Sequence, residues 1–232
     1  MALKKNINKT IEALTKISEA ITSELFLDDI LKLIVTVTAE LFGFKICSLM
    51  LLNDNGELVI RSSQAVSDEY LKKPPLKIGE GLAGMVVKEK KPCAIYDIYQ
   101  DKLFKYKEIA RKEGLCSVLC IPLIVKNRVI GAIDVYTSFP HEFTDKEENV
   151  LITIANQAAV VIENTELIVK TKVFTEELES RKLIERAKGI LMKNDNLTEE
   201  DAYKMIQKLS MNKRKTMKEI AEAVMIVEDL KK

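Results

Sequence analysis

The side chains best suited to bind a ligand by charge lie near the carboxyl-terminal end of this 232-residue chain. Over the whole sequence basic and acidic residues nearly cancel, so the net charge of +1 excludes no class of partner. Residues 202–218, however, contain basic side chains and no acidic one. These are Lys204, Lys208, Lys213, Arg214, Lys215 and Lys218. Such a patch in a neutral protein indicates contact with a polyanion, although a solvated helix face would have the same composition.

A second group of basic side chains surrounds a glycine slightly earlier in the chain. Between Arg181 and Met192, apolar residues recur at helical spacing. The basic residues beside them are Arg181, Lys182, Arg186, Lys188 and Lys193. Gly189 interrupts the pattern, and a glycine inside a helix costs about 1 kcal/mol relative to alanine. Two explanations are open: another helix packs closely against Gly189, or a ligand approaches the backbone there.

Metal, disulfide and catalytic chemistry have little support in the sequence. The four cysteines have no Cys-x-x-Cys spacing, and His141 is the sole histidine, which argues against a zinc site or a disulfide framework. His141 follows a proline in a loop, where it is either a surface residue, a haem ligand or a titrating group. Neither a catalytic triad nor a pair of carboxylates in a pocket is visible. We therefore expect no enzymatic activity and no metal.

Three glycines, Gly79, Gly81 and Gly84, have the spacing of a dinucleotide-binding loop. In that loop the glycines follow a strand of a βαβ unit, whereas here Pro74 and Pro75 precede them. The motif therefore predicts a tight turn into a helix that packs near a sheet.

The elements that must position these groups follow from hydrophobic periodicity and turn residues. Helices are predicted at 7–21 and at 28–41, and a long helix begins at Thr144-Asp145. Strands are predicted at 45–52, 58–62, 92–95, 117–125 and 128–136. Hairpin turns are expected at 53–56 and 126–127, so Asp54 is a turn residue rather than a phosphate acceptor. This order predicts an α+β fold with an antiparallel sheet and flanking helices.

Residues 1–165 resemble a known sensor domain. The motif Ile-Gly-Glu-Gly-Leu-Ala-Gly at 78–84, the hairpin Ile-Pro-Leu-Ile-Val-Lys-Asn-Arg-Val-Ile-Gly-Ala-Ile-Asp-Val at 121–135 and the segment 143–159 together resemble GAF domains. The resemblance implies a small-molecule pocket between the sheet and the segment that follows strand 92–95. Since GAF ligands vary widely, the ligand and any cofactor stay unknown.

Candidate pocket residues come from two strands and from the aromatic segment 96–106. They are Cys47, Leu49, Tyr96, Tyr99, Tyr106, Cys116, Val118 and Cys120. Cys116, Val118 and Cys120 alternate by two, so they share one face of their strand. If this face is inward, the two cysteines are either redox or metal sensors, or small hydrophobic core residues.

Residues 150–181 contain no proline or glycine and predict one connecting helix. A heptad seam with alternating spacings of three and four runs along it: Val150, Thr153, Gln157, Val160, Asn164, Leu167, Thr171, Phe174 and Leu178. A second stripe would cover the sheet: Leu151, Ile154, Ala158, Val161 and Ile162. Asn164 at an a position favours a parallel two-stranded coiled coil, so we expect a parallel homodimer.

The last segment predicts a three-helix domain, with a turn at 194–196, a helix capped by Thr198, a break at 210–216 and a final helix from Met217. The pattern Arg-x-x-Ile-x-x-Ala-Lys-Gly-Ile-Leu-Met, then Thr-x-x-x-Ala-Tyr, then Ser-Met-x-x-Arg, then Ile-Ala resembles the ANTAR family of RNA-binding transcription antiterminators. We assign this domain to residues 174–232. The resemblance implies binding to tandem stem-loops in leader RNA. The RNA-binding candidates are Lys188, Gly189, Met192, Ser210, Lys213 and Arg214, then Arg181, Arg186, Lys193 and Lys218.

The sequence thus predicts a signal-responsive antitermination regulator. A GAF-like domain stands before the RNA-binding module in place of a receiver domain, which shifts control from phosphorylation to ligand binding. Alternatives are a DNA-binding regulator, disfavoured because the turn at 210–216 is long for a helix-turn-helix, a protein-interaction scaffold, and a sulfoxide reductase that uses its cysteines. Neither a targeting segment nor a membrane span is visible, so we expect a cytoplasmic location without membrane contact.

Overall fold

The computed structural model of the protein describes residues 11–12, 15–16, 27–64 and 67–230. Its chain divides into two compact units, residues 1–166 and 167–232, which are described separately below. The helix predicted at 7–21 lies almost entirely outside the described residues.

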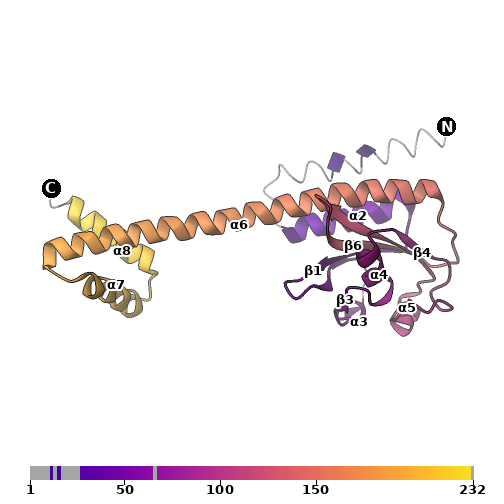
Figure 1. Ribbon diagram of the computed structural model, residues 1–232, viewed down its shortest axis with the longest axis horizontal. Helices are drawn as coiled ribbons and strands as arrows, with labels where there is room; N and C mark the ends of the chain where they lie inside the picture. The colour runs from indigo at the N-terminus through magenta and orange to yellow at the C-terminus, as the bar shows by residue number, and fades with distance from the viewer. Residues whose placement is uncertain (1–10, 13–14, 17–26, 65–66, 231–232) are drawn as a thin grey trace. The chain divides into compact units, whose positions relative to one another are not determined.

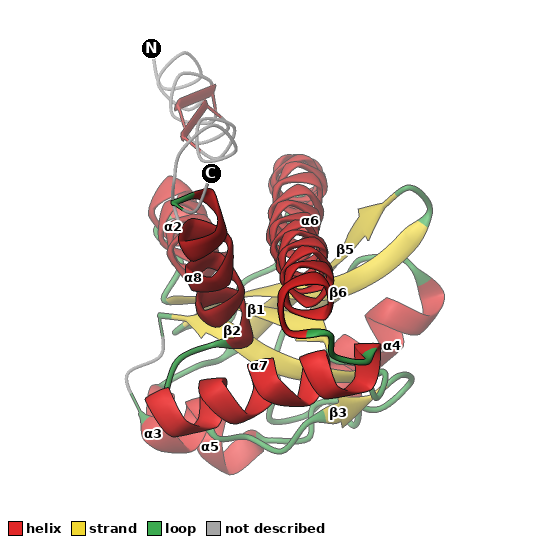
Figure 2. Ribbon diagram, turned by 90° about the vertical axis from the view of Figure 1, so that its left-hand side faces the viewer, coloured by secondary structure: helices red, strands yellow, loops and turns green. Residues whose placement is uncertain are grey.

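The first unit is built on one antiparallel sheet of six strands (Figure 1). The strands are β1 (Ile46–Leu52), β2 (Glu57–Ser63), β3 (Leu76–Lys77), β4 (Cys93–Ile95), β5 (Ser117–Val125) and β6 (Arg128–Thr137), arranged in the order β3-β2-β1-β6-β5-β4. This confirms the predicted antiparallel sheet and adds the short strand β3. Figure 2 shows the twist of the sheet in yellow.

Local turn chemistry explains the two hairpins. The side chain of Asn53 accepts hydrogen bonds from the backbone N–H groups of Asn55 and Glu57 and so shapes the β1–β2 turn. Lys126 and Asn127 both adopt positive φ, at 47° and 67°, as a two-residue type I′ turn requires. Both turns lie where the sequence predicted them.

Helices cover both faces of the sheet (Figure 1). One face packs against α2 (Leu27–Phe42) and the first part of α6 (Asp145–Asp195). The other face is covered by α3 (Asp68–Leu71), α4 (Gly81–Glu89), α5 (Lys107–Glu113) and the loops between them. The predicted second stripe of the connecting helix is confirmed, because Leu151, Ile154, Ala158, Val161 and Ile162 are all buried in the first of these cores.

The glycine motif serves backbone packing. A Cβ atom on Gly84 would lie 2.4 Å from the carbonyl oxygen of Lys77, which is closer than real Cβ atoms come to a neighbouring heavy atom. Gly79 donates its backbone N–H to the carbonyl of Gly84 at 2.8 Å. The glycine motif therefore lets α4 pack closely against β3. This confirms the prediction of a tight turn into a helix that packs near a sheet.

The second unit consists of the carboxyl-terminal part of α6, α7 (Glu199–Lys213) and α8 (Met217–Asp229). Thr198 caps α7, and Thr216 with Glu219 forms a capping box at α8. Figure 2 shows α7 and α8 in the foreground, joined by a short loop and crossing steeply. The predicted break at 210–216 is too long, because α7 continues to Lys213. The turn therefore comprises only residues 214–216, and its length no longer argues against a helix-turn-helix.

Candidate functional site

Lys188 lies at the contact between α6 and α7. Only 6% of its surface is exposed, and its ammonium group binds the carboxylates of Glu185 at 2.9 Å and Glu199 at 2.8 Å. These hydrogen bonds raise the pKa of Lys188 and lower the pKa of Glu199. Lys188 therefore ties the two helices together, and in this arrangement its charge is already neutralised.

Gly189 follows at the surface of α6. A Cβ atom built there would meet nothing within 4 Å, so no described part of the chain packs against this glycine. Of the two explanations for Gly189, close helix packing is therefore wrong within one chain. Arg186, Gly189 and Lys193 recur at intervals of three and four and share one exposed side of the helix. Met192, with 38% of its surface exposed, lies at the edge of this side.

The α7–α8 turn presents a second cationic surface. Arg214 ends α7 in the left-handed conformation at φ 53°, a position at which glycine is usual and other residues are uncommon. The backbone N–H of Lys215 bonds to the carbonyl of Ser210 at 3.1 Å, and the Ser210 hydroxyl donates to the carbonyl of Lys215 at 2.6 Å. Ser210 thus fixes the turn from which the exposed side chains of Lys213 and Arg214 project.

The remaining predicted residues differ in their exposure. Arg181 is exposed and lines a shallow groove beside Ile184 and Tyr203. Lys218 is half-buried near the start of α8. The second unit therefore has two cationic surfaces, one formed by Arg186, Gly189 and Lys193 on α6 and one formed by Lys213 and Arg214 at the α7–α8 turn.

The predicted pocket of the first unit requires a correction. Cys47 and Leu49 point to the face covered by α2 and α6 and are fully buried there. Their neighbours Ile46 and Met50 face the opposite core, beneath α4, and so do Val118 and Cys120. Both faces of β1 are buried, so its sequence shows no polar alternation that would have distinguished them.

The predicted tyrosines also separate. Tyr96 is 60% exposed and lies outside the core. Tyr99 and Tyr106 pack against the core beneath α4, and their hydroxyl groups donate to the carbonyls of Leu115 at 2.5 Å and Pro74 at 3.1 Å. Cys116 is half-buried, one residue before β5 begins. Of the predicted pocket residues, only Tyr106 lines the cavity that lies beneath α4 among the described residues.

This cavity has a volume of about 30 Å³ and lies between β1, β6 and the segment 103–106. Its polar lining includes Tyr106 together with Lys73, Lys105, Asp134 and Tyr136, and sequence reasoning missed the last four. Asp134 was detectable as the only acid within the otherwise apolar strand 129–136. A carboxylate is rarely buried without a partner, so its position in a central strand was the available signal.

The carboxyl group of Asp134 is only half satisfied. It is 4% exposed, and its Oδ2 atom accepts a hydrogen bond from the Tyr136 hydroxyl at 3.2 Å. Its Oδ1 atom has no hydrogen-bond partner among the described residues. Burial raises the pKa of Asp134, while the Cys120 thiol and the Lys73 ammonium oppose that shift. Burial also raises the pKa of Cys120 well above its ordinary value, so this thiol is not activated.

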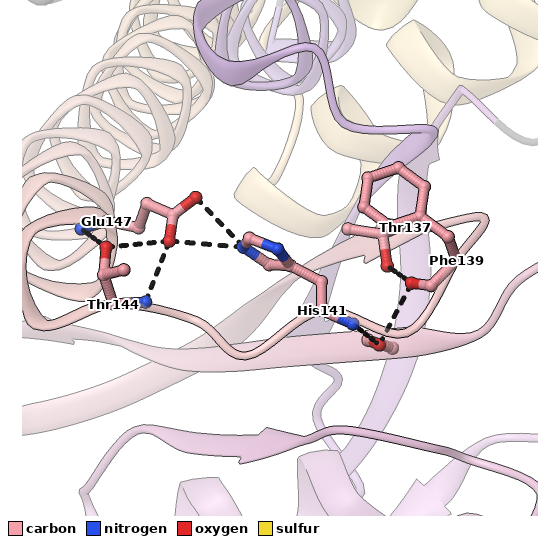
Figure 3. Close-up of polar contacts among 6 residues, drawn as sticks. Thr137, Phe139, His141, Thr144 and Glu147 are labelled. Carbon is pink, nitrogen blue, oxygen red and sulfur yellow. Dashed lines mark hydrogen bonds and ion pairs between the residues drawn. The ribbon is translucent and has the colours of Figure 1, made fainter.

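His141 is neither free at the surface nor placed in the cavity (Figure 3). Its Nε2 atom lies 3.1 Å from the carboxylate of Glu147, which also accepts a hydrogen bond from the backbone N–H of Thr144 at 2.8 Å. Its own backbone N–H donates to the hydroxyl of Ser117 at 2.8 Å. His141 therefore joins β5 to the start of α6. Among the described residues no cluster of histidine, cysteine, aspartate or glutamate is arranged to hold a metal ion.

Comparison with protein families agrees with this division. A model of the GAF domain matches residues 24–163, which is more than half of the chain, and a model of the ANTAR domain matches residues 173–225. The chain belongs to the GAF family and carries an ANTAR domain after the GAF domain. Arg186, Gly189, Lys193, Lys213 and Arg214 all fall within the ANTAR match, and Asp134 falls within the GAF match.

Named relatives match one domain or the other. The transcriptional regulatory protein PdtaR of Mycobacterium tuberculosis is 53% identical over 51 residues, covering 22% of this chain and 25% of that protein. The Nif-specific regulatory protein of Herbaspirillum seropedicae is 24% identical over 157 residues, covering 66% of this chain and 29% of that protein. The nitrate regulatory protein of Klebsiella oxytoca is 45% identical over 53 residues, covering 23% of this chain and 13% of that protein. The chain thus spans less than a third of the length of each.

Solved structures resemble the GAF domain. The GAF domain of a phosphoenolpyruvate-protein phosphotransferase from Coxiella burnetii superposes with a TM-score of 0.62 at 26% identity, over 70% of this chain and 97% of that one. A free methionine-R-sulfoxide reductase from Neisseria meningitidis superposes with a TM-score of 0.58 at 19% identity, over 68% of this chain and 91% of that one. The second likeness extends to the fold alone. In the described part of the chain no helix is both long and apolar enough to cross a membrane.

Proposed function

We propose that this protein is a transcription antitermination regulator that binds tandem stem-loops in leader RNA under the control of its GAF domain. The observation that carries the proposal is the surface of the ANTAR domain. Gly189 leaves the backbone of α6 open between the basic side chains of Arg186 and Lys193. Arg214 itself adopts the strained left-handed conformation, and its side chain is exposed to solvent. Backbone strain of this kind tends to occur at functional positions. We also propose that this role is non-enzymatic and cytoplasmic.

RNA is the polyanion favoured over DNA by the ANTAR match. Sequence-specific RNA recognition targets unpaired loop bases, which need an open surface for the base and cations for the neighbouring phosphates. Gly189 and Met192 provide the open surface, and Arg186, Lys193, Lys213 and Arg214 provide the cations. Lys188, whose charge is neutralised by two glutamates, takes the role of holding α7 in position for this surface.

A homodimer would bind two stem-loops at once. Residues 167–179 of α6 are all exposed, and they include large apolar side chains on the predicted seam: Leu167 at 47%, Phe174 at 63% and Leu178 at 60% exposure. Exposed apolar residues at heptad spacing are the signature of a coiled coil. We propose that two copies pair in parallel along this seam. Two RNA-binding domains on one dimer would then raise the affinity for adjacent hairpins by raising the effective concentration of the second site.

The same helix offers a route for the signal. Helix α6 contributes Leu151 and Ile154 to the core of the GAF domain and Ala187 and Leu191 to the core of the ANTAR domain, within one element of 51 residues. A ligand that shifts the packing of the sheet against α6 would change the pairing or rotation of two such helices. Control of RNA binding would then follow from geometry, without phosphorylation.

The test compares three labelled nucleic acids with the full chain: an RNA of two adjacent hairpins, the same RNA with one hairpin deleted, and a duplex DNA. We expect salt-sensitive binding to the first, at least tenfold weaker binding to the second, and weaker binding still to the third. Single-round transcription through a terminator that overlaps the second hairpin should show increased read-through when the protein is added.

Each competing function has its own outcome. Equal or tighter binding to duplex DNA would establish the DNA-binding alternative, which the short α7–α8 turn permits. If none of the three nucleic acids binds at low salt with the dimer intact, the protein-interaction scaffold becomes the favoured function. Because phosphate contacts release counterions, loss of affinity with rising salt is required by both nucleic-acid functions.

A further inference from the structure

Three charged side chains line the cavity of the GAF domain; Lys105 is paired with Glu80, whereas Asp134 and Lys73 do not bind each other. Asp134 presents an unpartnered Oδ1 atom, and Lys73 lines the same cavity. The ammonium group of Lys73 lies 3.5 Å above the ring of Tyr70 instead of binding the carboxylate. Burial lowers the pKa of Lys73 to about 8, so this cation is itself poorly solvated. The cavity thus holds a carboxylate oxygen of Asp134 that lacks a hydrogen-bond donor and an ammonium group of Lys73 that contacts an aromatic ring rather than a carboxylate.

The hydroxyl groups around Asp134 are already engaged, and the Cys120 thiol, a weak donor, lies opposite Asp134 in the β5–β6 pair and interacts with its carboxyl group. The hydroxyl of Tyr70 is paired with the hydroxyl of Ser48 at 2.8 Å, which is in turn 2.7 Å from that of Ser63. The hydroxyl of Tyr136 donates to Oδ2 of the carboxylate. An unsatisfied buried acceptor costs about 1–3 kcal/mol and is rare in native proteins. Oδ1, which has no hydrogen-bond partner among the described residues, is therefore open to a donor that a ligand supplies.

We propose that this site binds a small zwitterion of the α-amino acid class, whose ammonium group donates to Asp134 and whose carboxylate binds Lys73. The inference rests on the sensor role proposed above and names its ligand class. A zwitterion satisfies both protein charges and leaves the site neutral. A simple amine would leave Lys73 unpaired and repelled, and a simple carboxylic acid would leave Asp134 unpaired.

Binding requires a small opening of the cavity. Its present volume of about 30 Å³ holds one water molecule. The inner wall is the rigid sheet, but the outer wall includes Lys73, Lys105 and Tyr106. Lys73 and Tyr106 are only half-buried and Lys105 is exposed, so rotation of these side chains enlarges the site without moving a strand. The rings of Phe104 and Tyr136, which pack edge to face, supply an apolar surface for the ligand side chain.

The experiment measures binding of the twenty L-amino acids, one at a time, to the full chain by thermal shift and by isothermal titration calorimetry. We expect at least one of them to bind. For each amino acid that binds, the matching compound without the amino group and the matching compound without the carboxylate should each bind at least tenfold more weakly. The variants Asp134→Asn and Lys73→Met should lose at least tenfold in affinity.

Matched controls separate the site from general effects of charge. Asp54→Asn in the β1–β2 turn and Lys72→Met next to Lys73 are exposed changes of the same types and should leave affinity within twofold. If Asp134→Asn fails to fold, Lys73→Met carries the test, because its side chain lies in the outer wall. The proposal is overturned if no amino acid binds, if either truncated analogue binds as well as its parent, or if the folded site variants retain full affinity.

RNA binding is assayed in parallel on the same preparations without added ligand. Amino acid binding without any RNA binding would remove the antitermination function and leave the ligand class standing. RNA binding without any amino acid binding would remove the ligand class and leave the regulator standing.

Discussion

The two units of this protein differ in how much apolar surface they hide. The GAF domain buries extensive apolar surface on both faces of its sheet. The ANTAR domain has a core of six buried residues, three of which are alanines: Ala187, Leu191, Ala202, Ile206, Ile220 and Ala221. Around this small core Tyr203, Met205 and Met211 are 40–73% exposed. The GAF domain encloses a small cavity, whereas the ANTAR domain leaves large side chains exposed on its surface.

This difference suggests a division of stability as well as of function. A small core supplies little free energy of folding, so a domain of this kind depends on partners or on a neighbouring element. In the ANTAR domain that element is α6, which Lys188 ties to α7 and which carries the exposed seam. The predictions below test whether the two units depend on their surroundings as differently as their cores do.

The largest effect is expected from the seam of α6. Burying a large apolar side chain contributes about 1.5–3 kcal/mol, and in a dimer each substitution occurs twice. Phe174→Asp should therefore weaken dimerisation by about 3–6 kcal/mol, or at least a hundredfold in Kd. Sedimentation equilibrium measures this directly. Val169→Asp is the control, since Val169 is similarly exposed, at 53%, but lies off the seam. A wild-type monomer, or equal effects of the two substitutions, would refute the coiled coil.

A smaller effect of opposite sign is expected in the GAF domain. Asp134 has a pKa raised by burial, so the folded state holds its proton more tightly than the unfolded state does. Stability is therefore lost as pH rises from about 4 through the raised pKa. Asp134→Asn removes the buried charge and should raise the free energy of unfolding at pH 7 by about 1–3 kcal/mol. Urea unfolding should show a higher free energy of unfolding for Asp134→Asn than for wild type at pH 7, and a smaller difference between the two at pH 4. Lower stability of the variant at pH 7 would show that Asp134 supports the fold.

The smallest effect concerns the tie between α6 and α7. Lys188 lowers the pKa of Glu199, so this interaction stabilises the protein above the unfolded pKa of glutamate, about 4.3, and is lost as pH falls. Lys188→Met should lower the melting temperature of the ANTAR domain at pH 7, and the difference from wild type should shrink as the pH falls below about 4.3. The exposed Lys182→Met is the control. Thermal unfolding followed by circular dichroism measures both melting temperatures. An unchanged melting temperature for Lys188→Met would show that Lys188 does not hold α7 in position.

Much of the fold could be predicted because its signals are local. Turns and helix caps depend on hydrogen bonds to residues a few positions away, as at Asn53 and Thr198. The apolar stripe from Leu151 to Ile162 is likewise visible as a short repeat in the sequence. The face of β1 that meets the cavity could not be predicted, because the strand is buried on both sides and its alternation carries no information. The choice of Cys47 and Leu49 failed for this reason.

Site residues were harder to predict where they depend on distant partners. The sequence around Lys188 indicated an exposed lysine that is free to bind RNA. In the structure its charge is neutralised by Glu199, which lies beyond the next turn. Lys73 and Asp134 lie far apart in the sequence and line the same cavity only because the segment after α3 passes over the sheet. The exposure of Gly189, in contrast, agrees with the ligand-approach explanation that the sequence offered.

The most direct test of the account is the salt dependence of binding to the two-hairpin RNA for the wild-type chain and for the double variant Lys213→Ala, Arg214→Ala. Removing two phosphate contacts should lower affinity about tenfold to a hundredfold at physiological salt and reduce the slope of log K against log salt by about 1.5 per domain. The control is Lys91→Ala, Lys102→Ala, which removes two exposed charges from the GAF domain and should change neither quantity. Equal losses in the two double variants, or an unchanged slope in the first, would contradict RNA binding by the α7–α8 turn.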